Sequence, residues 1–510
     1  MEKNSSDNNF KYVDQKVYAY PHRVQLYNPE GNPHVIEDPD LWVACKINST
    51  RKKQFASELY FEKLKLSLEK RQRFIEAVRD HSWNRLHMGA LVVGGSDVEM
   101  RIASLVSSAI ALGKFYKIQQ QTRRSVVLDE VFLPDSLKES KETLQSIENR
   151  FELYYNVTNP RKGKIKGFDQ YVQDIFKILP LSTMTRIVGN WDLRTVLQYS
   201  RWDKINYLPS SVVDFAKKLR SKISNAYPLM SKSFIVSERM SKEQAHMLRT
   251  LVKSNDLTDE PMLWYNDHSF LLPKNPFYEK IHHQYDLEII RKKEGPVAKL
   301  IGYYGPEKPT LDDLLELFNS KKESSKSILE VNYLVFASKI DFSGAIDTWR
   351  HTRNNRLVEP IYHALEKGIT TSVPKIFERG GSDRTVNYRD KIIEASKDAV
   401  KIYYELVGEG ISPKEAIHVL PHNIELFQIE AMDLFSFLNV MALRTCIHAR
   451  PEVQKWAKNL LQEAGKTKEL KGIEDLNPDK ILARGIQFGY CMEMGNCKKC
   501  GDIFYVPDPF

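Results

Sequence analysis

LPLSTMTRIVGNWDLRTVLQYSRWDKINYLPSSVVDFAKKL, residues 179–219, recurs in divergent form as LPHNIELFQIEAMDLFSFLNVMALRTCIHARPEVQKWAKNL, residues 420–460. The two stretches align without a gap at a constant separation of 241 residues, and nine of the 41 aligned positions are identical. Identity at this level is weak by itself. The repeat therefore has to be judged by whether other features occur in the same order around both stretches.

Features upstream of each stretch do recur in order. They are a double tyrosine (Tyr154-Tyr155 and Tyr403-Tyr404), a Thr-Arg pair (Thr122-Arg123 and Thr352-Arg353) followed by an acidic residue (Asp129 or Glu359), and the tetrapeptides Val43–Lys46 and Val297–Leu300. We predict two divergent copies, the first degenerate, at about 22–225 and 284–480. Residues 1–21 form a tail, 226–283 a linker or insertion, and 481–510 a cysteine-containing tail. The alternative is chance similarity between two helical segments.

Composition limits the class of protein. Of the 510 residues, 42% are hydrophobic and 28% charged, which excludes wholesale disorder and a membrane protein. Five cysteines make no disulfide framework, and with no signal peptide visible we expect a cytoplasmic protein. The net charge of +9 suits nucleotide or phosphate partners and favours nucleic acid only weakly. Apolar spacing predicts a long charged helix from Gln54 to His81.

Three runs of the second copy carry a resemblance. They are FSGAIDTWRHTRNNRLVEPIY (342–362), GEGISPKEAIHVLP (408–421) and NVMALRTCIHARPEVQKWA (439–457). In this order they resemble flavin-dependent thymidylate synthases, whose signature is RHRxxSxNExSxRY. The resemblance implies an α+β fold, here two fused copies of a domain with a mostly antiparallel sheet flanked by long helices.

The same resemblance implies an activity, reductive methylation of dUMP to dTMP, with FAD, NADPH and a methylene-tetrahydrofolate donor. Arginine suits such a site because its guanidinium grips phosphate oxygens in pairs and stays charged. A homodimer forming a pseudo-tetramer is the expected assembly, without a membrane or a metal. The implied site residues are Arg444 and His81 as catalytic, Arg350, His351, Arg353, Asn439, His448, Arg123 and Arg124 for the cofactor, and Arg194, Glu359 and Glu130 for the substrate.

Departures from the signature keep other functions open. Thr352 stands at the third position of the Arg-His-Arg triplet, and Phe435 stands where the family has an arginine. The chain is then either the enzyme, a non-catalytic nucleotide- or nucleic-acid-binding scaffold that kept the fold, or a flavin-dependent enzyme that alkylates another uracil. The first copy keeps His81 and Arg194 but has Asp203 in place of Arg444, so the copies could complement each other in composite sites.

Individual residues also have plainer interpretations. Arg444 is either a ligand-binding or a buried structural arginine. Cys491, Cys497 and Cys500 are either part of a zinc site or an ordinary reduced tail, because a structural zinc ion normally needs four ligands. The adjacent His282 and His283 point in different directions on any regular element, which argues against a metal site there.

Overall fold

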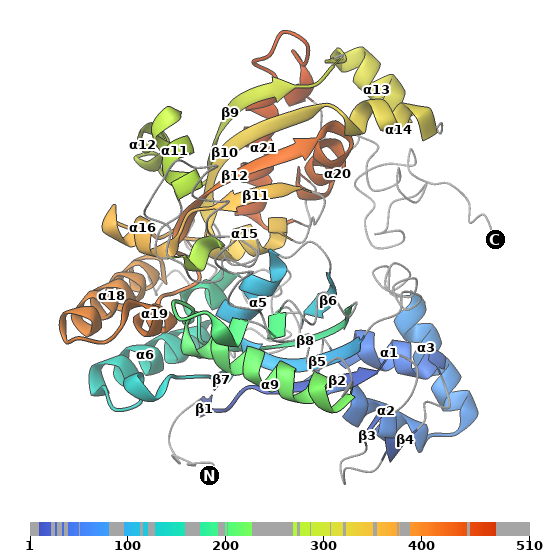
Figure 1. Cartoon of the computed structure of the whole chain (residues 1–510), viewed down its shortest axis with the longest axis vertical. Helices are drawn as coiled ribbons and strands as arrows, with labels where there is room; N and C mark the ends of the chain where they lie inside the picture. Colours follow the sequence, from blue (N-terminus) through green and yellow to red (C-terminus); the bar gives the residue numbers. More distant parts are fainter. Residues whose placement is uncertain are drawn as a thin grey trace. The chain divides into compact units, whose positions relative to one another are not determined.

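The structure is a computed structural model (Figure 1). It describes residues 10–21, 26–27, 33–34, 39–49, 52–80, 96–112, 116–120, 128–158, 174–191, 199–200, 202–226, 269–272, 276–285, 287–306, 308–319, 323–349, 354–374, 377, 388–445 and 449–475. Each of its two compact units is built from two segments, Met1–Leu272 with Gly380–His422, and Pro273–Arg379 with Asn423–Phe510. Both units combine helices with antiparallel sheets, which confirms the predicted α+β class. Within the described ranges, none of the helices is both long enough and apolar enough to cross a bilayer.

The first unit is organised around a four-stranded antiparallel sheet in the order β2-β5-β8-β6, which we call the first sheet. Its strands are β2 (Lys16–Pro21), β5 (Ser96–Ala103), β6 (Tyr116–Gln120) and β8 (Met184–Trp191). Two short pairs accompany it, β1 (Lys11–Tyr12) with β7 (Glu130–Val131) and β3 (Leu26–Tyr27) with β4 (Pro33–His34). The α-helices are α1 (Pro39–Ser49), α2 (Ala56–Leu64), α3 (Leu68–Asp80), α5 (Ser104–Ala111), α6 (Lys141–Thr158), α9 (Ser210–Ala226), α18 (Tyr388–Gly408) and α19 (Pro413–Ala416). Short 3-10 turns are η2 (Asp135–Leu137), η4 (Phe176–Ile178), η5 (Trp202–Lys204), η7 (Ser269–Leu271) and η8 (Ile417–Val419).

The second unit contains the second sheet, which is also antiparallel and has the order β9-β10-β12-β11. Its strands are β9 (Val297–Tyr304), β10 (Tyr333–Asp341), β11 (Asn355–Val358) and β12 (Glu425–Asp433). The helices are α11 (Pro276–Gln284), α12 (Glu288–Arg291), α13 (Leu311–Asn319), α14 (Glu323–Glu330), α15 (Phe342–Trp349), α16 (Ile361–Glu366), α20 (Leu434–Thr445), α21 (Pro451–Ala464) and the 3-10 turn η9 (Ile473–Asp475).

The two sheets share one topology. Strands β2, β5, β8 and β6 occupy the same places as β9, β10, β12 and β11. Helix α9 packs against β2, and α21 packs against β9 (Figure 1). Strands β8 and β12 begin 241 residues apart, as do helices α9 and α21. The register pairs Ala103–Met184 and Asp341–Glu425 are also equivalent, so β5 and β10 are related by 238 residues. The separation found in the sequence thus links elements in matching positions.

Two reciprocal backbone hydrogen bonds join the repeated Leu-Pro segments inside the first unit. The Leu181 amide donates to the Leu420 carbonyl oxygen at 2.8 Å, and the His422 amide donates to the Leu179 carbonyl oxygen at 3.2 Å. Leu179 aligns with Leu420, and Leu181 aligns with His422. Each segment therefore gives the other the same contact that it receives, which is the pattern of a two-fold interface.

Segment Gly380–His422 belongs with the first unit, although the sequence assigned it to the second copy. Arg150 on α6 is 1% exposed, and its Nη1 donates to the carbonyl oxygens of Ile178 at 3.4 Å and Val419 at 2.8 Å. Ser146, on the same helix, donates to Asp398 of α18 at 2.5 Å. Buried polar bonds of this kind fix α6 against α18, and thereby one copy against part of the other.

Two predicted correspondences between the copies are wrong. Val43–Lys46 lies in helix α1 whereas Val297–Leu300 lies in strand β9, and the counterpart of β9 in the sheet is β2. Short apolar runs do not distinguish helix from strand, which explains the error. Because β2 lies within residues 1–21, part of the predicted tail belongs to the sheet. The pair Thr122-Arg123 follows β6 in the chain, whereas Thr352-Arg353 precedes β11, the equivalent strand.

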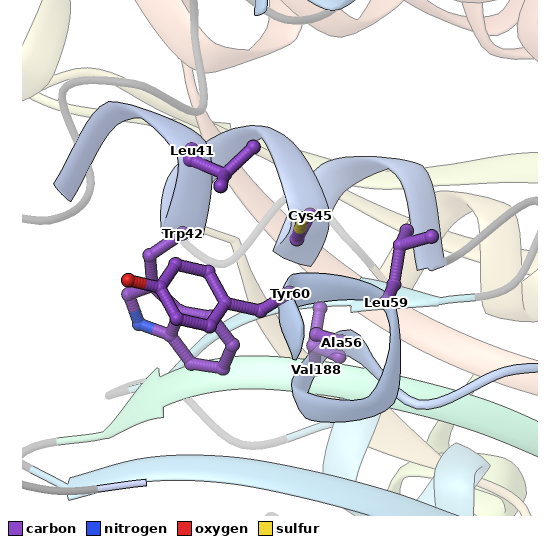
Figure 2. Packing of buried hydrophobic residues seen from close by; sticks show 7 residues of the cluster. All are labelled: Leu41, Trp42, Cys45, Ala56, Leu59, Tyr60 and Val188. Atoms are coloured by element: carbon purple, nitrogen blue, oxygen red, sulfur yellow. The ribbon is translucent and has the colours of Figure 1, made fainter. Parts of the chain in front are cut away.

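The long helix predicted from Gln54 to His81 is divided into α2 and α3. Ser67 separates them, and its hydroxyl accepts a hydrogen bond from the Lys70 amide at 3.5 Å, as an N-cap residue does. Helix α2 packs against α1 through Leu41, Trp42, Cys45, Ala56, Leu59 and Tyr60, with Val188 of β8 beneath them (Figure 2). The Trp42 and Tyr60 rings meet edge to face at 5.8 Å, a favourable aromatic geometry.

Candidate functional site

Helices α15 and α20 in the second unit begin in the same way. The aspartate that ends the preceding strand caps each helix: Asp341 accepts from the Gly344 amide at 2.7 Å, and Asp433 accepts from the Ser436 amide at 2.7 Å. Because β10 and β12 are antiparallel, the two helices start at opposite ends of this strand pair. The side chain of Arg444 then connects their last turns.

We call Asp347, Arg444 and Arg450 the arginine corner. Arg444 is half-buried, and its Nη2 donates to the Asp347 carbonyl oxygen at 2.7 Å. Arg450 is 7% exposed, and it binds the Asp347 carboxylate through Nε at 2.9 Å and Nη2 at 2.8 Å. It also donates to Ser343, which lies one helical turn before Asp347. Two guanidinium groups at the C-terminal end of α15 complement the partial negative charge of that helix end.

A second set of contacts fixes the last residue of α15. Trp349 is fully buried, and its indole Nε1 donates to Gln428 Oε1 of β12 at 2.9 Å. Arg356 of β11 donates to the carbonyl oxygens of Thr348 at 2.7 Å and Trp349 at 3.3 Å. The same guanidinium forms an ion pair with Glu430 at 2.5 Å. The segment that leads into Arg350 therefore leaves from a firmly held helix end.

Most of the residues predicted for the site lie outside the described ranges. These are His81, Arg123, Arg124, Arg194, Arg350, His351, Arg353 and His448. Trp349 and Asn354 flank Arg350 to Arg353 in the chain, and Thr445 and Ala449 flank His448. The described structure thus brings Arg444 to the helix end that precedes Arg350.

Asn439 does not join this group. It is half-buried on α20, five residues before Arg444. At 3.6 residues per turn, positions five apart differ by about 140° around the helix axis. Asn439 and Arg444 therefore leave α20 in different directions, which separates two residues that the sequence grouped.

Glu359, which the sequence assigned to the substrate, is fully buried at the end of β11. Its Oε1 is bound by Arg291 and lies 2.8 Å from His363 Nδ1, and its Oε2 accepts from the Phe427 amide at 3.0 Å. Burial alone would raise the pKa of Glu359, but the bonds to His363, Arg291 and Phe427 lower it below its ordinary value. The carboxylate is thus ionised and engaged by groups of its own unit.

The surroundings of Glu359 form a polar cluster that the sequence did not predict. The rings of Tyr278, His282 and His363 lie 5.3–5.6 Å apart, and Arg291 lies 4.8 Å from the Phe427 ring centroid. Burial lowers the pKa of His282, and burial followed by the charge of Glu359 raises that of Tyr278 well above 10. The only signal in the sequence was the unusual density of histidine and aromatic residues near His282.

Glu130, the other acidic residue predicted to bind substrate, lies in β7 of the first unit. Its carboxylate forms an ion pair with Arg101 Nη1 at 3.1 Å, and both side chains are largely buried, at 20% and 14% exposed. In the described structure this carboxylate therefore has a partner within its own unit.

The donors at the arginine corner fit an anionic ligand such as a nucleotide. Arg444 is a half-buried cation, and two buried acceptor atoms nearby, Asn354 Oδ1 and Glu430 Oε2, have no hydrogen-bond partner in the described part of the chain. Buried polar atoms normally have partners, so this corner can accept as well as donate hydrogen bonds. Among the described residues, no group of three His, Cys, Asp or Glu side chains is arranged to hold a metal ion, and the tail cysteines lie outside those ranges.

Comparison with known proteins points in one direction. Residues 312–467 match the family described as "Thymidylate synthase complementing protein". A "Flavin-dependent thymidylate synthase" of Pyrococcus abyssi is 31% identical over 104 residues, which cover 20% of this chain and 42% of that protein. The protein of the same description from Pyrococcus furiosus is 29% identical over 96 residues, 19% of this chain and 38% of that protein. A third, from Pyrococcus horikoshii, is 33% identical over 87 residues, 17% of this chain and 35% of that protein.

The matched family region contains β10, α15, β11, β12, α20 and most of α21, and so includes the whole arginine corner. The chain spans less than half the length of the relatives that it matches. Over residues 312–467, this chain is similar to the thymidylate synthase complementing proteins.

Proposed function

We propose that this chain is a flavin-dependent thymidylate synthase-like enzyme that methylates dUMP reductively to dTMP, with methylene-tetrahydrofolate as donor and NADPH as reductant. The observation that carries the proposal is the Arg444–Asp347 hydrogen bond. It joins the two stretches that resemble the family, and it puts a half-buried guanidinium beside the helix end that precedes Arg350. Such an arrangement suits a ligand with phosphate and uracil oxygens.

Each residue would have a limited task. Arg444 would stabilise negative charge that develops on the uracil ring, in the manner of an oxyanion hole. Arg350, His351, Arg353, Asn439 and His448 would bind the flavin nucleotide. Bound FAD would supply the hydride chemistry, while the protein binds, orients and excludes water. Asp347 and Arg450 would keep Arg444 in place, since Asp347 contacts both arginines.

We further propose that the two sheets descend from a tandem duplication and that the copies complement each other in a homodimer forming a pseudo-tetramer. The common strand order and the reciprocal bonds between Leu179–Leu181 and Leu420–His422 support this. His81, Arg123, Arg124, Arg194, Glu130 and Glu359 would be the further contributors. His81→Ala should then lower turnover or flavin retention, and a silent variant would remove His81 from the site.

A non-catalytic nucleotide-binding scaffold is the second candidate. The observation that favours it is the state of two predicted site positions. Glu359 is fully engaged by internal partners, and Phe435, which stands where the family has an arginine, is 7% exposed in the core of α20. Both positions would serve the fold and leave less of the family's chemistry available.

A turnover assay separates these functions. The full chain is supplied with FAD, NADPH, methylene-tetrahydrofolate and dUMP, and dTMP is measured. Formation of dTMP that depends on all four supports the enzyme. Binding of dUMP without any product supports the scaffold. NADPH oxidation that needs a uracil compound other than dUMP supports the uracil-alkylating variant.

A further inference from the structure

Matching positions of the two sheets can be compared residue by residue, because the equivalent strands fix the alignment. The pairs Ala103–Met184 and Asp341–Glu425 relate α5 to α15, and the common starts of β8 and β12 relate the residues that follow. On this basis, Asp347, Gln428, Glu430, Arg444 and Arg450 of the second unit correspond to Ala109, Ile187, Gly189, Asp203 and Pro209 of the first. Every polar group of the second set is lost or has changed its charge in the first.

Aromatic rings close the corresponding corner of the first unit. Trp191, Tyr199 and Trp202 are 0%, 1% and 0% exposed, and successive ring centroids lie 5.1 Å and 4.6 Å apart. The Tyr199 hydroxyl donates to the Ile110 carbonyl oxygen in the last turn of α5 at 3.4 Å. A side chain again binds the helix end, as Arg444 does at α15, but here it is neutral and buried.

Charge also separates the two corners. Asp203, which stands in place of Arg444, forms a 2.6 Å ion pair with Arg220. Arg220 also donates to the Ser200 carbonyl oxygen, through Nε at 3.1 Å and Nη2 at 3.0 Å. The guanidinium is therefore committed to groups of its own unit, and the aspartate would repel a phosphate.

We infer that each chain carries one nucleotide site, at the arginine corner of the second unit, and that the first unit's corner is a closed aromatic counterpart that binds no nucleotide. This rests on the proposed function, since it assumes that the arginine corner binds dUMP. The first sheet would then stabilise the assembly and not add a second site of its own.

Equilibrium dialysis of the full-length chain with labelled dUMP, in the presence of FAD, tests the inference. We expect saturation at about one dUMP per chain. Arg444→Ala should weaken binding at least tenfold, whereas Asp203→Asn at the matched position of the first unit should change the affinity less than twofold. Both variants are first compared with the parent by circular dichroism and thermal melting, so that an unfolded variant is recognised.

The outcomes separate the inference from the proposed function. Saturation at two dUMP per chain would overturn the inference and leave the function standing. One dUMP per chain that survives Arg444→Ala would place the site elsewhere, and it would also overturn the inference. No saturable binding of dUMP would contradict the proposed function and the inference together.

Discussion

Arg444 Nη2 donates a 2.7 Å hydrogen bond to the main-chain carbonyl oxygen of Asp347. The two residues are 97 positions apart in the sequence, on helices that start from different strands. Asp347 precedes Arg350 by three residues, so one bond ties the arginine of one family-like stretch to the entry of the other. Its acceptor belongs to the backbone, and the contact would therefore survive many substitutions at position 347.

Replacing Arg444 tests whether this residue binds ligand. Arg444→Ala should weaken dUMP binding by about 1.5–3 kcal/mol, the usual contribution of hydrogen bonds to a charged group, and should lower stability far less. Isothermal titration and a melting curve measure the two effects. Arg444→Lys should recover only part of the affinity, because an ammonium group cannot grip a phosphate in the bidentate manner.

Arg389→Ala is a suitable control, since Arg389 is an exposed arginine paired with Asp390 at 3.4 Å and lies outside the corner. It should alter neither dUMP binding nor the melting temperature. If Arg444→Ala lowered the melting temperature and left dUMP affinity unchanged, Arg444 would be a structural arginine.

The buried Arg291–Glu359 pair should matter for stability. Arg291→Met leaves the fully buried Glu359 carboxylate without its cation, and removing one partner of a buried pair typically costs about 3–5 kcal/mol. The double variant Arg291→Met with Glu359→Met should lose less stability than Arg291→Met alone, because no charge remains buried. Urea unfolding of both variants and the parent gives these free energies. A double variant less stable than the single one would contradict the account.

Glu359 also predicts a pH effect. Its pKa is lowered in the folded state from an ordinary value of 4.5, so its stabilising contribution is present above pH 4.5 and is lost as the pH falls below that value. Unfolding free energies between pH 3 and pH 6 should therefore decrease less in a Glu359→Gln variant than in the parent.

Glu99 should produce the opposite dependence. Burial raises its pKa from 4.5 to about 8, and hydrogen bonds from Ser57 and Ala56 offset only part of that shift. A raised carboxyl pKa stabilises the fold below pH 4.5, and the contribution is lost as the pH rises to about 8. Stability measured by urea unfolding should thus fall between pH 5 and pH 8 in the parent. Glu99→Gln should flatten that slope, and an equal slope in both proteins would contradict the assigned pKa.

Cutting the chain between its halves tests the repeated Leu-Pro contact. A specific protease site is introduced between residues 226 and 269 and cleaved in the folded protein. Because Arg150 and the reciprocal bonds of Leu179–Leu181 hold segment Gly380–His422 to the first unit, the two pieces should co-elute in gel filtration. They should separate only in denaturant. Separation in native buffer would contradict these contacts.

The sequence predicted part of this arrangement well. The 241-residue separation was found from Leu179 and Leu420, and it matches the starts of β8 with β12 and of α9 with α21. It failed upstream, where the separation between equivalent strands changes to 238, so that the Thr-Arg pairs were matched across different sides of β6 and β11. Short motifs cannot reveal such a shift, whereas strand register does.

The environment of the candidate site was harder to predict. Glu359 was assigned to the substrate, yet its partners Arg291 and Phe427 are each 68 positions away. Arg450 was not singled out, although it binds Asp347 and Ser343 from more than 100 positions away. Contacts over such separations depend on how strands and helices pack, and no local spacing in the sequence encodes them.

The most direct test of the account is the visible absorbance spectrum of the full-length protein, after loading with FAD and desalting, for the parent and for Arg444→Ala. The account predicts flavin bands that stay with the parent, and a spectrum that shifts when dUMP is added to the parent but not to Arg444→Ala. A parent protein that is colourless after desalting and does not respond to dUMP would contradict a flavin and nucleotide site at the arginine corner.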